Sequence, residues 1–304
     1  QGGPQDRRHL KKYDKLVALS DQALRETSTA EAPWTIIEAT DRRYRELTVA
    51  KHILEAITTH NQRLASRAAV RPAVTPPPPV ADGPTILSTL DLTKKLDNGE
   101  YRDELGCLQT RLSELSRAAR DQGVSTVMVF EGWDAAGKGG VIRRLTCGLD
   151  ARCYSIVPIG VPTDEEKARH YLWRFWRHLP RAGNMTLFDR SWYGRVLVER
   201  VEGFAMEDEW RRAYKEINDF EELLVEHGIV LRKFWLHISK DEQWRRFQER
   251  EEIPYKQYKI GPEDYRNREK WELYEAAVNE MVERTSTGLA PWTLVEANNK
   301  RYAR

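Results

Sequence analysis

Apolar residues recur along this chain in two different patterns. Some stretches have the period of an α-helix; they lie at 8–26, 41–65, 101–122, 141–149, 163–178, 207–227, 241–251 and 262–284. Others are short continuous apolar runs that favour β-strands; they lie at 34–38, 124–130, 153–159, 184–189, 230–238 and 290–297. From residue 85 onward the two kinds alternate, which predicts an α/β fold with a parallel sheet covered by helices on both faces.

A proline-rich stretch interrupts this pattern at residues 65–84. Four consecutive prolines, Pro76 to Pro79, exclude a helix or a central strand and favour extended polyproline II. We therefore interpret 65–84 as a semi-rigid linker between residues 1–64 and a larger domain at 85–304.

The end of the chain repeats a segment near its beginning. Residues 27–44 match residues 285–302 at 11 of 18 positions without a gap, Pro33 facing Pro291 and Trp34 facing Trp292. Such self-similarity is typical of duplicated structural units. We predict that residues 1–64 are the C-terminal remnant of a first domain copy and that 85–304 form a nearly complete second copy. Because the first residue is Gln1, we interpret the chain as a fragment.

Composition and charge narrow the function classes. The 304 residues include 49 Lys and Arg against 47 Asp and Glu, a net charge of +2, so bulk charge does not indicate a nucleic-acid binder. The three cysteines form no CxxC pair, which argues against a zinc site and favours a reducing cytoplasm. No apolar run reaches the roughly 20 residues that a membrane span needs, and no signal peptide opens the chain.

The candidate chemistry begins directly after the run 124–130. The sequence EGWDAAGKGG places Gly132, Gly137, Lys138, Gly139 and Gly140 between a predicted strand and a predicted helix. This spacing is typical of a P-loop, whose backbone N–H groups and lysine bind phosphate. Gly139 replaces the Ser or Thr that usually holds magnesium, so we expect Asp134, inside the loop, to be one of the metal ligands.

A second acidic position follows the apolar run MTLFD. Asp189 ends this run, which is the Walker B arrangement and would bring a second carboxylate beside the P-loop. Asp134 and Asp189 are therefore our candidate Mg²⁺ ligands; a turn residue or helix cap is the plainer interpretation of Asp189. Arg190, Arg195 and Arg200 follow among glycines, which predicts a mobile phosphate clamp, or lid, at about 190–206.

A third candidate is a pair of arginines on one helix face. Arg246 and Arg250 lie four residues apart after the predicted helix cap Ser239. We expect this pair to bind the transferring phosphate, as lid arginines of nucleotide kinases do. Salt bridges to Glu242 and Glu249 are an equally good interpretation of either arginine alone.

Taken together, EGWDAAGKGG, FDRSWYGRVLVERVEGF, HISKDEQWRRF and APWTLVEA resemble the polyphosphate kinase 2 family over about residues 85–304. In its duplication and in the segment GRVLVERVEGF the chain resembles the two-domain subgroup of this family, which makes ADP from polyphosphate and AMP. The resemblance implies a thymidylate-kinase-like three-layer α/β/α fold, dependence on Mg²⁺ (with Mn²⁺ as the alternative ion) and direct transfer without a phosphoenzyme. It implicates Asp134, Lys138, Asp189 and Arg190 in catalysis, and places Arg195 and Arg200 in the lid.

Several hypotheses stay open at this point. The first is a phosphotransferase acting on inorganic polyphosphate and AMP, without nucleic-acid or membrane partners and with a tendency to form homo-oligomers. The alternatives are a polyphosphate-dependent ADP or GDP kinase of the same family, an NTP-dependent P-loop kinase, and a truncated module that binds polyphosphate without catalysis. The residues specify phosphoryl transfer with a metal; the donor rests on the resemblance.

Overall fold

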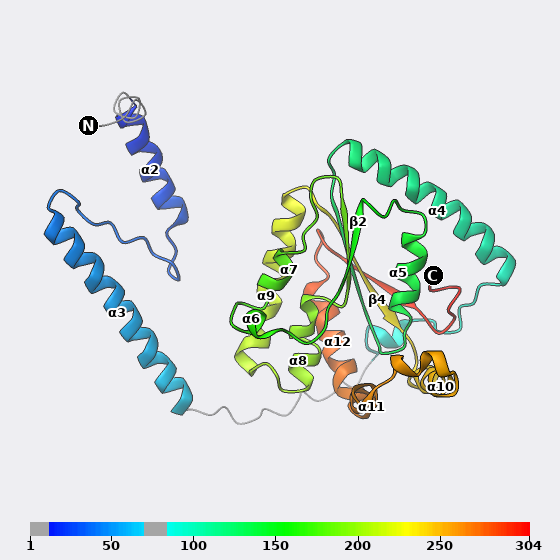
Figure 1. Ribbon diagram of the computed structural model, residues 1–304. Coiled ribbons are helices and arrows are strands. Elements are labelled where there is room, and N and C mark those ends of the chain that lie inside the picture. Colours follow the sequence, from blue (N-terminus) through cyan, green and yellow to red (C-terminus); the bar gives the residue numbers. More distant parts are fainter. Residues whose placement is uncertain (1–11, 70–83) are drawn as a thin grey trace. The chain divides into compact units, whose positions relative to one another are not determined.

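Five parallel strands form the sheet of the larger part of the chain (Figure 1). The computed structural model describes residues 12–69 and 84–304. The strands are β1 (Thr126–Gly132), β2 (Tyr154–Pro158), β3 (Met185–Asp189), β4 (Val230–His237) and β5 (Trp292–Glu296). Their order is β2-β3-β1-β4-β5, and every neighbouring pair is parallel. The predicted parallel α/β fold is thus confirmed.

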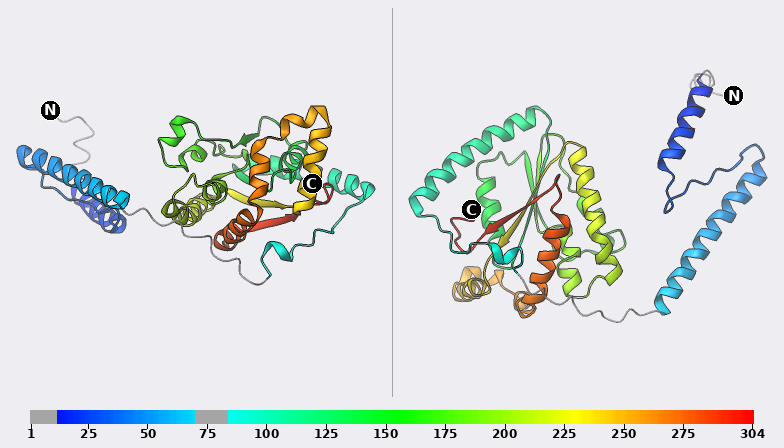
Figure 2. Two further views of the ribbon diagram at one scale, coloured as in Figure 1. Left: turned by 90° about the horizontal axis from the view of Figure 1, so that it is seen from below. Right: turned by 180° about the vertical axis from the view of Figure 1, so that it is seen from behind.

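Helices connect and cover these strands. The longer ones in this part are α4 (Asn98–Asp121), α5 (Lys138–Thr146), α9 (Glu207–Glu226), α10 (Lys240–Glu252), α11 (Pro262–Glu269) and α12 (Trp271–Thr285). The short ones are α6 (Asp164–Lys167), α7 (Trp173–Trp176), α8 (Val198–Val201) and the 3₁₀ helices η1 (Leu87–Thr89), η2 (Trp192–Arg195) and η3 (Pro254–Lys259). Figures 1 and 2 show α4 and α5 on one face of the sheet, and α9 and α12 on the other.

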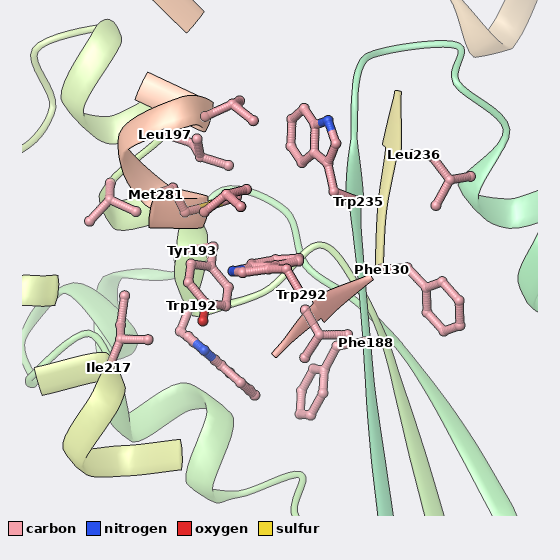
Figure 3. Packing of buried hydrophobic residues seen from close by; sticks show 14 of the residues in the cluster. Phe130, Phe188, Trp192, Tyr193, Leu197, Ile217, Trp235, Leu236, Met281 and Trp292 are labelled. Atoms are coloured by element: carbon pink, nitrogen blue, oxygen red, sulfur yellow. The ribbon is translucent and has the colours of Figure 1, made fainter. Parts of the chain in front are cut away.

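The central strand is apolar because it is buried on both faces. Val127, Val129 and Phe130 of β1 are at most 1% exposed. On the α9 and α12 side, Trp192, Tyr193 and Trp292 fill the space between sheet and helices (Figure 3). Phe130 is paired in register with Asp189, so the carboxyl ends of β1 and β3 lie side by side. The P-loop and Asp189 therefore meet at one edge of the sheet.

Two predicted helices are divided in the structure. The helix expected at 163–178 is present only as α6 and α7, although its predicted cap at Thr163 forms a capping box with Glu166. The helix expected at 262–284 is interrupted at Lys270, whose φ of −98° and ψ of 25° leave the helical region. The interruption lets Trp271 stack on Trp133 at a ring-centroid distance of 3.7 Å. Tertiary packing has overridden the helical periodicity at that point.

The chain divides into two units, Gln1–Pro76 and Pro77–Arg304. The first contains α2 (Tyr13–Thr27) and α3 (Arg42–Ala69), joined by an extended segment. The strand predicted at 34–38 is wrong, because this unit contains no neighbouring strand among its described residues that could pair with it. Helix α3 also runs past residue 65, where the linker was expected to begin. Residues 8–11 of the first predicted helix, and linker residues 70–83, lie outside the described residues.

The two segments that are similar in sequence make the same local hydrogen bonds. The indole N–H of Trp34 donates to the hydroxyl of Thr27 at 2.8 Å, and that of Trp292 donates to Thr285 at 2.9 Å. The backbone N–H of each tryptophan also donates to the serine six residues before it. The two segments thus share these local contacts, and the duplication itself stays a prediction.

Within residues 12–69 and 84–304, no helix combines the length and the apolar character needed to cross a membrane.

Candidate active site

The loop between β1 and α5 depends on glycine at its first position. Gly132 has a φ of +148°, and a Cβ atom there would lie 2.5 Å from the carbonyl oxygen of Leu236. Gly137 has a φ of +113° and directly precedes the first residue of α5. By contrast, a Cβ at Gly139 would meet nothing within 4 Å, so this position is open to an approaching ligand. The P-loop conformation therefore follows from the glycine spacing.

Lys138 lies folded over this loop. Its ammonium donates to the carbonyl oxygens of Gly132 at 2.7 Å and Trp133 at 3.2 Å. Burial, and then the nearby positive charge of Arg190, lower the pKa of Lys138, while Asp134 and Asp189 act in the opposite direction. The lysine is therefore close enough to both carboxylates and to Arg190 to be electrostatically coupled to all three.

The side chain of Asp134 links the P-loop to two other elements. One carboxylate oxygen accepts from Arg190 at 2.8 Å, and the other accepts from Asn267 of α11 at 2.9 Å. Arg190 itself has a φ of +67°, an unusual value for a residue other than glycine. Non-glycine residues held in this region often belong to functional sites. Asn267 was not predicted, because nothing in its sequence context distinguishes it.

A buried glutamate was also missed by the sequence reasoning. Glu131 is 5% exposed and accepts a hydrogen bond from the hydroxyl of Ser191 at 2.8 Å. Burial raises its pKa, although the charges of Lys138 and Arg190 oppose the rise. Its place beside the P-loop glycine is the one signal that could have identified it.

A pocket opens beside the loop, between β1, β4, α8 and α11. Its walls combine carboxylates, amides and aromatic rings; they are formed by Glu131, Gly132, Trp133, Asp134, Arg190, Gly194, Leu197, Val198, Trp235, Gln243, Asn267 and Tyr274. The indole N–H of Trp235 is buried and has no hydrogen-bond acceptor among the residues that the structure describes. A pocket of this character suits a ligand with a flat ring and a charged end.

The predicted lid arginines have protein partners in this structure. Arg195 lies 3.2 Å from Glu199 and stacks over the ring of Tyr171. Arg200 is 10% exposed and donates to Glu280 at 2.6 Å and to the hydroxyl of Tyr214 at 2.9 Å. Neither lines the pocket. The start of the predicted lid is anchored as well, since Trp192 and Tyr193 are fully buried.

Arg246 differs from the expectation of a phosphate-binding residue, whereas the expectation for Arg250 stays a prediction. Arg246 is 3% exposed, and all five of its N–H groups are used by protein acceptors; these are Glu242, Ala135, Ala136, Ala297 and Asn298. Arg250 donates to the carbonyl oxygen of Lys259 at 2.8 Å. In this structure Arg246 therefore has no donor left for a phosphate, and it contacts the P-loop from the outside.

The residues present fit a magnesium ion that is held partly by substrate. Asp189 ends β3 close to the charges of Lys138 and Arg190, and no described residue donates a hydrogen bond to its carboxylate, so that carboxylate can bind a cation. Three or more His, Cys, Asp or Glu side chains do not gather into a metal cluster anywhere in residues 12–69 or 84–304. Mg²⁺ commonly takes one or two carboxylates together with phosphate oxygens and water, which is what Asp134 and Asp189 can offer.

The strand order, the glycine-rich loop after β1 and the aspartate ending the adjacent strand define a P-loop kinase fold. Comparison with known proteins makes this class more specific. The model of the family "Polyphosphate kinase 2 (PPK2)" matches residues 2–65 and 95–304. The chain belongs to the polyphosphate kinase 2 family.

Individual relatives agree with this assignment. The chain is 53% identical over 303 residues to "Polyphosphate:AMP phosphotransferase" of Pseudomonas aeruginosa, a match covering 99% of this chain and 60% of the relative. It is 41% identical over 211 residues to "GDP-polyphosphate phosphotransferase" of Mycobacterium tuberculosis, covering 69% of this chain and 72% of the relative. A crystal structure of a putative polyphosphate kinase 2 from Pseudomonas aeruginosa has a TM-score of 0.83 and 53% identity, covering 96% of this chain and 59% of that one. The chain thus spans about 60% of the length of the first of these relatives.

Proposed function

We propose that this chain is a Mg²⁺-dependent phosphotransferase that moves the terminal phosphoryl group of inorganic polyphosphate to AMP, giving ADP. The observation that carries the proposal is the gathering of Lys138, Asp134, Asp189 and Arg190 around one P-loop. Each position was expected from the sequence, and each has a role in phosphoryl transfer, where catalysis consists mainly of positioning and charge stabilisation.

The reaction balances without a covalent enzyme intermediate. An oxygen of the AMP phosphate forms a bond to the terminal phosphorus of the donor chain. The bond from that phosphorus to its bridging oxygen breaks, and the shortened polyphosphate leaves with the electron pair. No general base is required near neutral pH, since a phosphate monoester with a second pKa of about 6 is already mostly dianionic.

Different residues of the chain bind the donor, neutralise charge and hold the metal ion in this reaction. The N–H groups at the start of α5 and the ammonium of Lys138 hold the donor end. Arg190 neutralises charge on the phosphoryl group during its transfer, once the guanidinium leaves Asp134 and donates its hydrogen bonds to phosphate oxygens instead. Asp134 and Asp189 would hold Mg²⁺, whose charge screens the phosphate oxygens from one another.

The acceptor is assigned to the pocket between the P-loop and α8. Trp133, Trp235 and Leu197 provide apolar walls for a base, while the opposite end is charged. AMP as the acceptor, and polyphosphate as the donor, are supported by the name of the relative from Pseudomonas aeruginosa. The name of the Mycobacterium tuberculosis relative keeps GDP as a second acceptor to be tested.

A matrix of donors and acceptors tests the proposal. The chain is incubated with Mg²⁺, with polyphosphate or ATP as donor, and with AMP, ADP or GDP as acceptor, and the products are separated by ion-exchange chromatography. We expect ADP from polyphosphate and AMP. Product formed only with ATP would select an NTP-dependent kinase, and binding of polyphosphate without product from any pair would select a non-catalytic module.

Two substitutions locate the activity in the proposed site. Lys138→Ala and Asp189→Ala should each lower turnover by about 10²-fold or more, because each removes a group that acts on the transition state. Lys167→Ala is the matched control, since Lys167 is exposed and its one ion pair within residues 12–69 and 84–304 is with Asp164. Rates like those of the unmodified protein in either site variant would exclude this site.

The remaining expectations are part of the same proposal. We infer a cytoplasmic protein, in agreement with three cysteines that are all free thiols. Homo-oligomers are expected from the resemblance and can be measured by sedimentation.

A further inference from the structure

Three consecutive carbonyl groups of the P-loop are held by one helix outside the loop. Gln243 of α10 donates to the carbonyl oxygen of Asp134 at 3.1 Å. One turn further on, a single nitrogen of Arg246 donates to the carbonyl oxygens of Ala135 at 2.9 Å and Ala136 at 2.8 Å. Helix α10 thus binds the three successive carbonyls of Asp134, Ala135 and Ala136.

The same guanidinium is fixed on its other side. Its second terminal nitrogen donates to the carbonyl oxygens of Ala297 at 2.7 Å and Asn298 at 2.9 Å, just after β5. Its Nε donates to Glu242 at 2.6 Å. Because every N–H group of the rigid, planar guanidinium donates a hydrogen bond, Arg246 cannot rotate without breaking several of these bonds. The P-loop is thereby tied to the end of the outermost strand.

The geometry of the peptide bond links these contacts with α10 to the direction of the N–H groups in the P-loop. In a planar trans peptide the N–H of one residue points opposite to the carbonyl of the residue before it. Turning the carbonyl of Ala136 toward α10 therefore turns the N–H of Gly137 the other way, while the N–H of Ala136 donates to the carbonyl oxygen of Trp133 at 3.1 Å. The N–H groups of Gly137, Lys138 and Gly139 have no acceptor within residues 12–69 and 84–304, as a phosphate-binding loop requires.

The backbone at this point needs an external restraint. Ala135 has a φ of +63°, which costs free energy for any residue other than glycine. A loop without the contacts to α10 would relax from this conformation and lose the alignment of its amides.

We propose that Arg246, together with Gln243, is a positioning residue that aligns the P-loop amides for phosphate, acting through the loop and not by contact with that phosphate. This role replaces the phosphate-binding role expected for Arg246 from its spacing. It does not depend on which donor or acceptor the protein uses.

The test measures phosphate affinity separately from stability. Inorganic tripolyphosphate is titrated into the whole chain by calorimetry, and thermal unfolding is followed on the same samples. Arg246→Lys keeps the charge but cannot reach both pairs of carbonyls, and we expect it to bind tripolyphosphate about 10- to 100-fold more weakly while still unfolding cooperatively. Arg245→Lys is the matched control, because Arg245 is exposed and, among the described residues, forms ion pairs with Glu242 and Glu249 alone; its affinity should stay unchanged.

If Arg246→Lys does not fold, Gln243→Met decides the question, because it removes the donor to Asp134, together with an acceptor for Arg268, and keeps the side-chain volume. We expect its affinity to fall about tenfold, the scale on which a misplaced binding group acts. A second readout is rescue: guanidinium ion should restore tripolyphosphate binding to Arg246→Gly and leave Arg245→Gly unaffected. A folded Arg246→Lys or Gln243→Met protein with unchanged affinity would overturn the proposal, and so would an unmodified protein that does not bind tripolyphosphate.

Discussion

The ammonium of Lys233 lies 2.7 Å from the carboxylate of Glu221, and both side chains are at most 1% exposed. Lys233 donates two further hydrogen bonds, to the hydroxyl of Tyr193 and to the carbonyl of Thr285, each at 2.8 Å. Glu221 in turn accepts from the indole of Trp192. One buried ion pair therefore ties β4, α9, the end of α12 and the segment after Arg190 together.

Removing one member of this pair should destabilise the protein strongly. In Lys233→Met the carboxylate of Glu221 stays buried without a counter-ion, and breaking such a pair typically costs about 3–5 kcal/mol. Urea denaturation followed by tryptophan fluorescence measures the loss. The double variant Lys233→Met with Glu221→Gln keeps an acceptor for Trp192 without a buried charge, so it should be at least about 1 kcal/mol more stable than the single variant. A double variant no more stable than Lys233→Met would show that the charge is not the cause.

His237 should make stability depend on pH below neutrality. Its Nδ1 accepts a hydrogen bond from the indole of Trp133 at 3.0 Å, and burial lowers its pKa to about 4, while the charge of Glu296 acts in the opposite direction. The unfolded chain binds the proton near pH 6.5, and the folded chain binds it only near pH 4. The contribution of neutral His237 to stability is therefore present above pH 6.5 and is lost as the pH falls toward 4. The loss between pH 7.5 and pH 5 should be about 2 kcal/mol.

The contribution of His237 is isolated by comparing variants. His237→Asn removes the titrating group and keeps an acceptor near Nδ1, so its stability should fall less between pH 7.5 and pH 5 than that of the unmodified protein. His227→Asn, at the end of α9, is the control and should keep the full pH dependence. Equal slopes for His237→Asn and the unmodified protein would contradict the assignment.

Two glycines of the P-loop should respond differently to alanine. At Gly132 a Cβ would lie 2.5 Å from the carbonyl oxygen of Leu236, so Gly132→Ala should lose roughly 2 kcal/mol or more of stability. At Gly139 the added Cβ meets no atom, so Gly139→Ala should change stability by less than about 1 kcal/mol. It should still weaken tripolyphosphate binding, because the methyl group occupies space open to the ligand. If Gly139→Ala binds normally, phosphate does not approach that position.

Much of the fold could be predicted because its signals are local. The apolar runs 124–130 and 184–189 identified β1 and β3, and the glycine spacing identified the loop between β1 and α5. Lys138, Asp134, Asp189 and Arg190 could be proposed as site residues because strand ends and motif positions place them at one sheet edge.

The rest of the site depends on contacts between distant segments. Asn267 reaches Asp134 from 133 positions away, and nothing near Asn267 in sequence indicates this contact. Arg246 has the spacing of a lid arginine, yet its direction is set by carbonyl groups more than 100 positions away. The predicted strand 34–38 was wrong for a related reason, since strand formation needs a pairing partner that local sequence cannot reveal.

The repeated threonine–tryptophan contact gives a test in which one copy serves as the control for the other. Thr285 is fully buried and its hydroxyl accepts from Trp292, which is 8% exposed. Thr285→Val preserves the shape but leaves that buried indole N–H without its acceptor, which should cost about 1–3 kcal/mol in the free energy of unfolding. Trp34 is 59% exposed, so water can replace the hydroxyl of Thr27, and Thr27→Val should change stability by less than about 0.5 kcal/mol. Chemical denaturation of both variants compares them directly; similar losses would mean that Trp34 is as well buried in solution as Trp292.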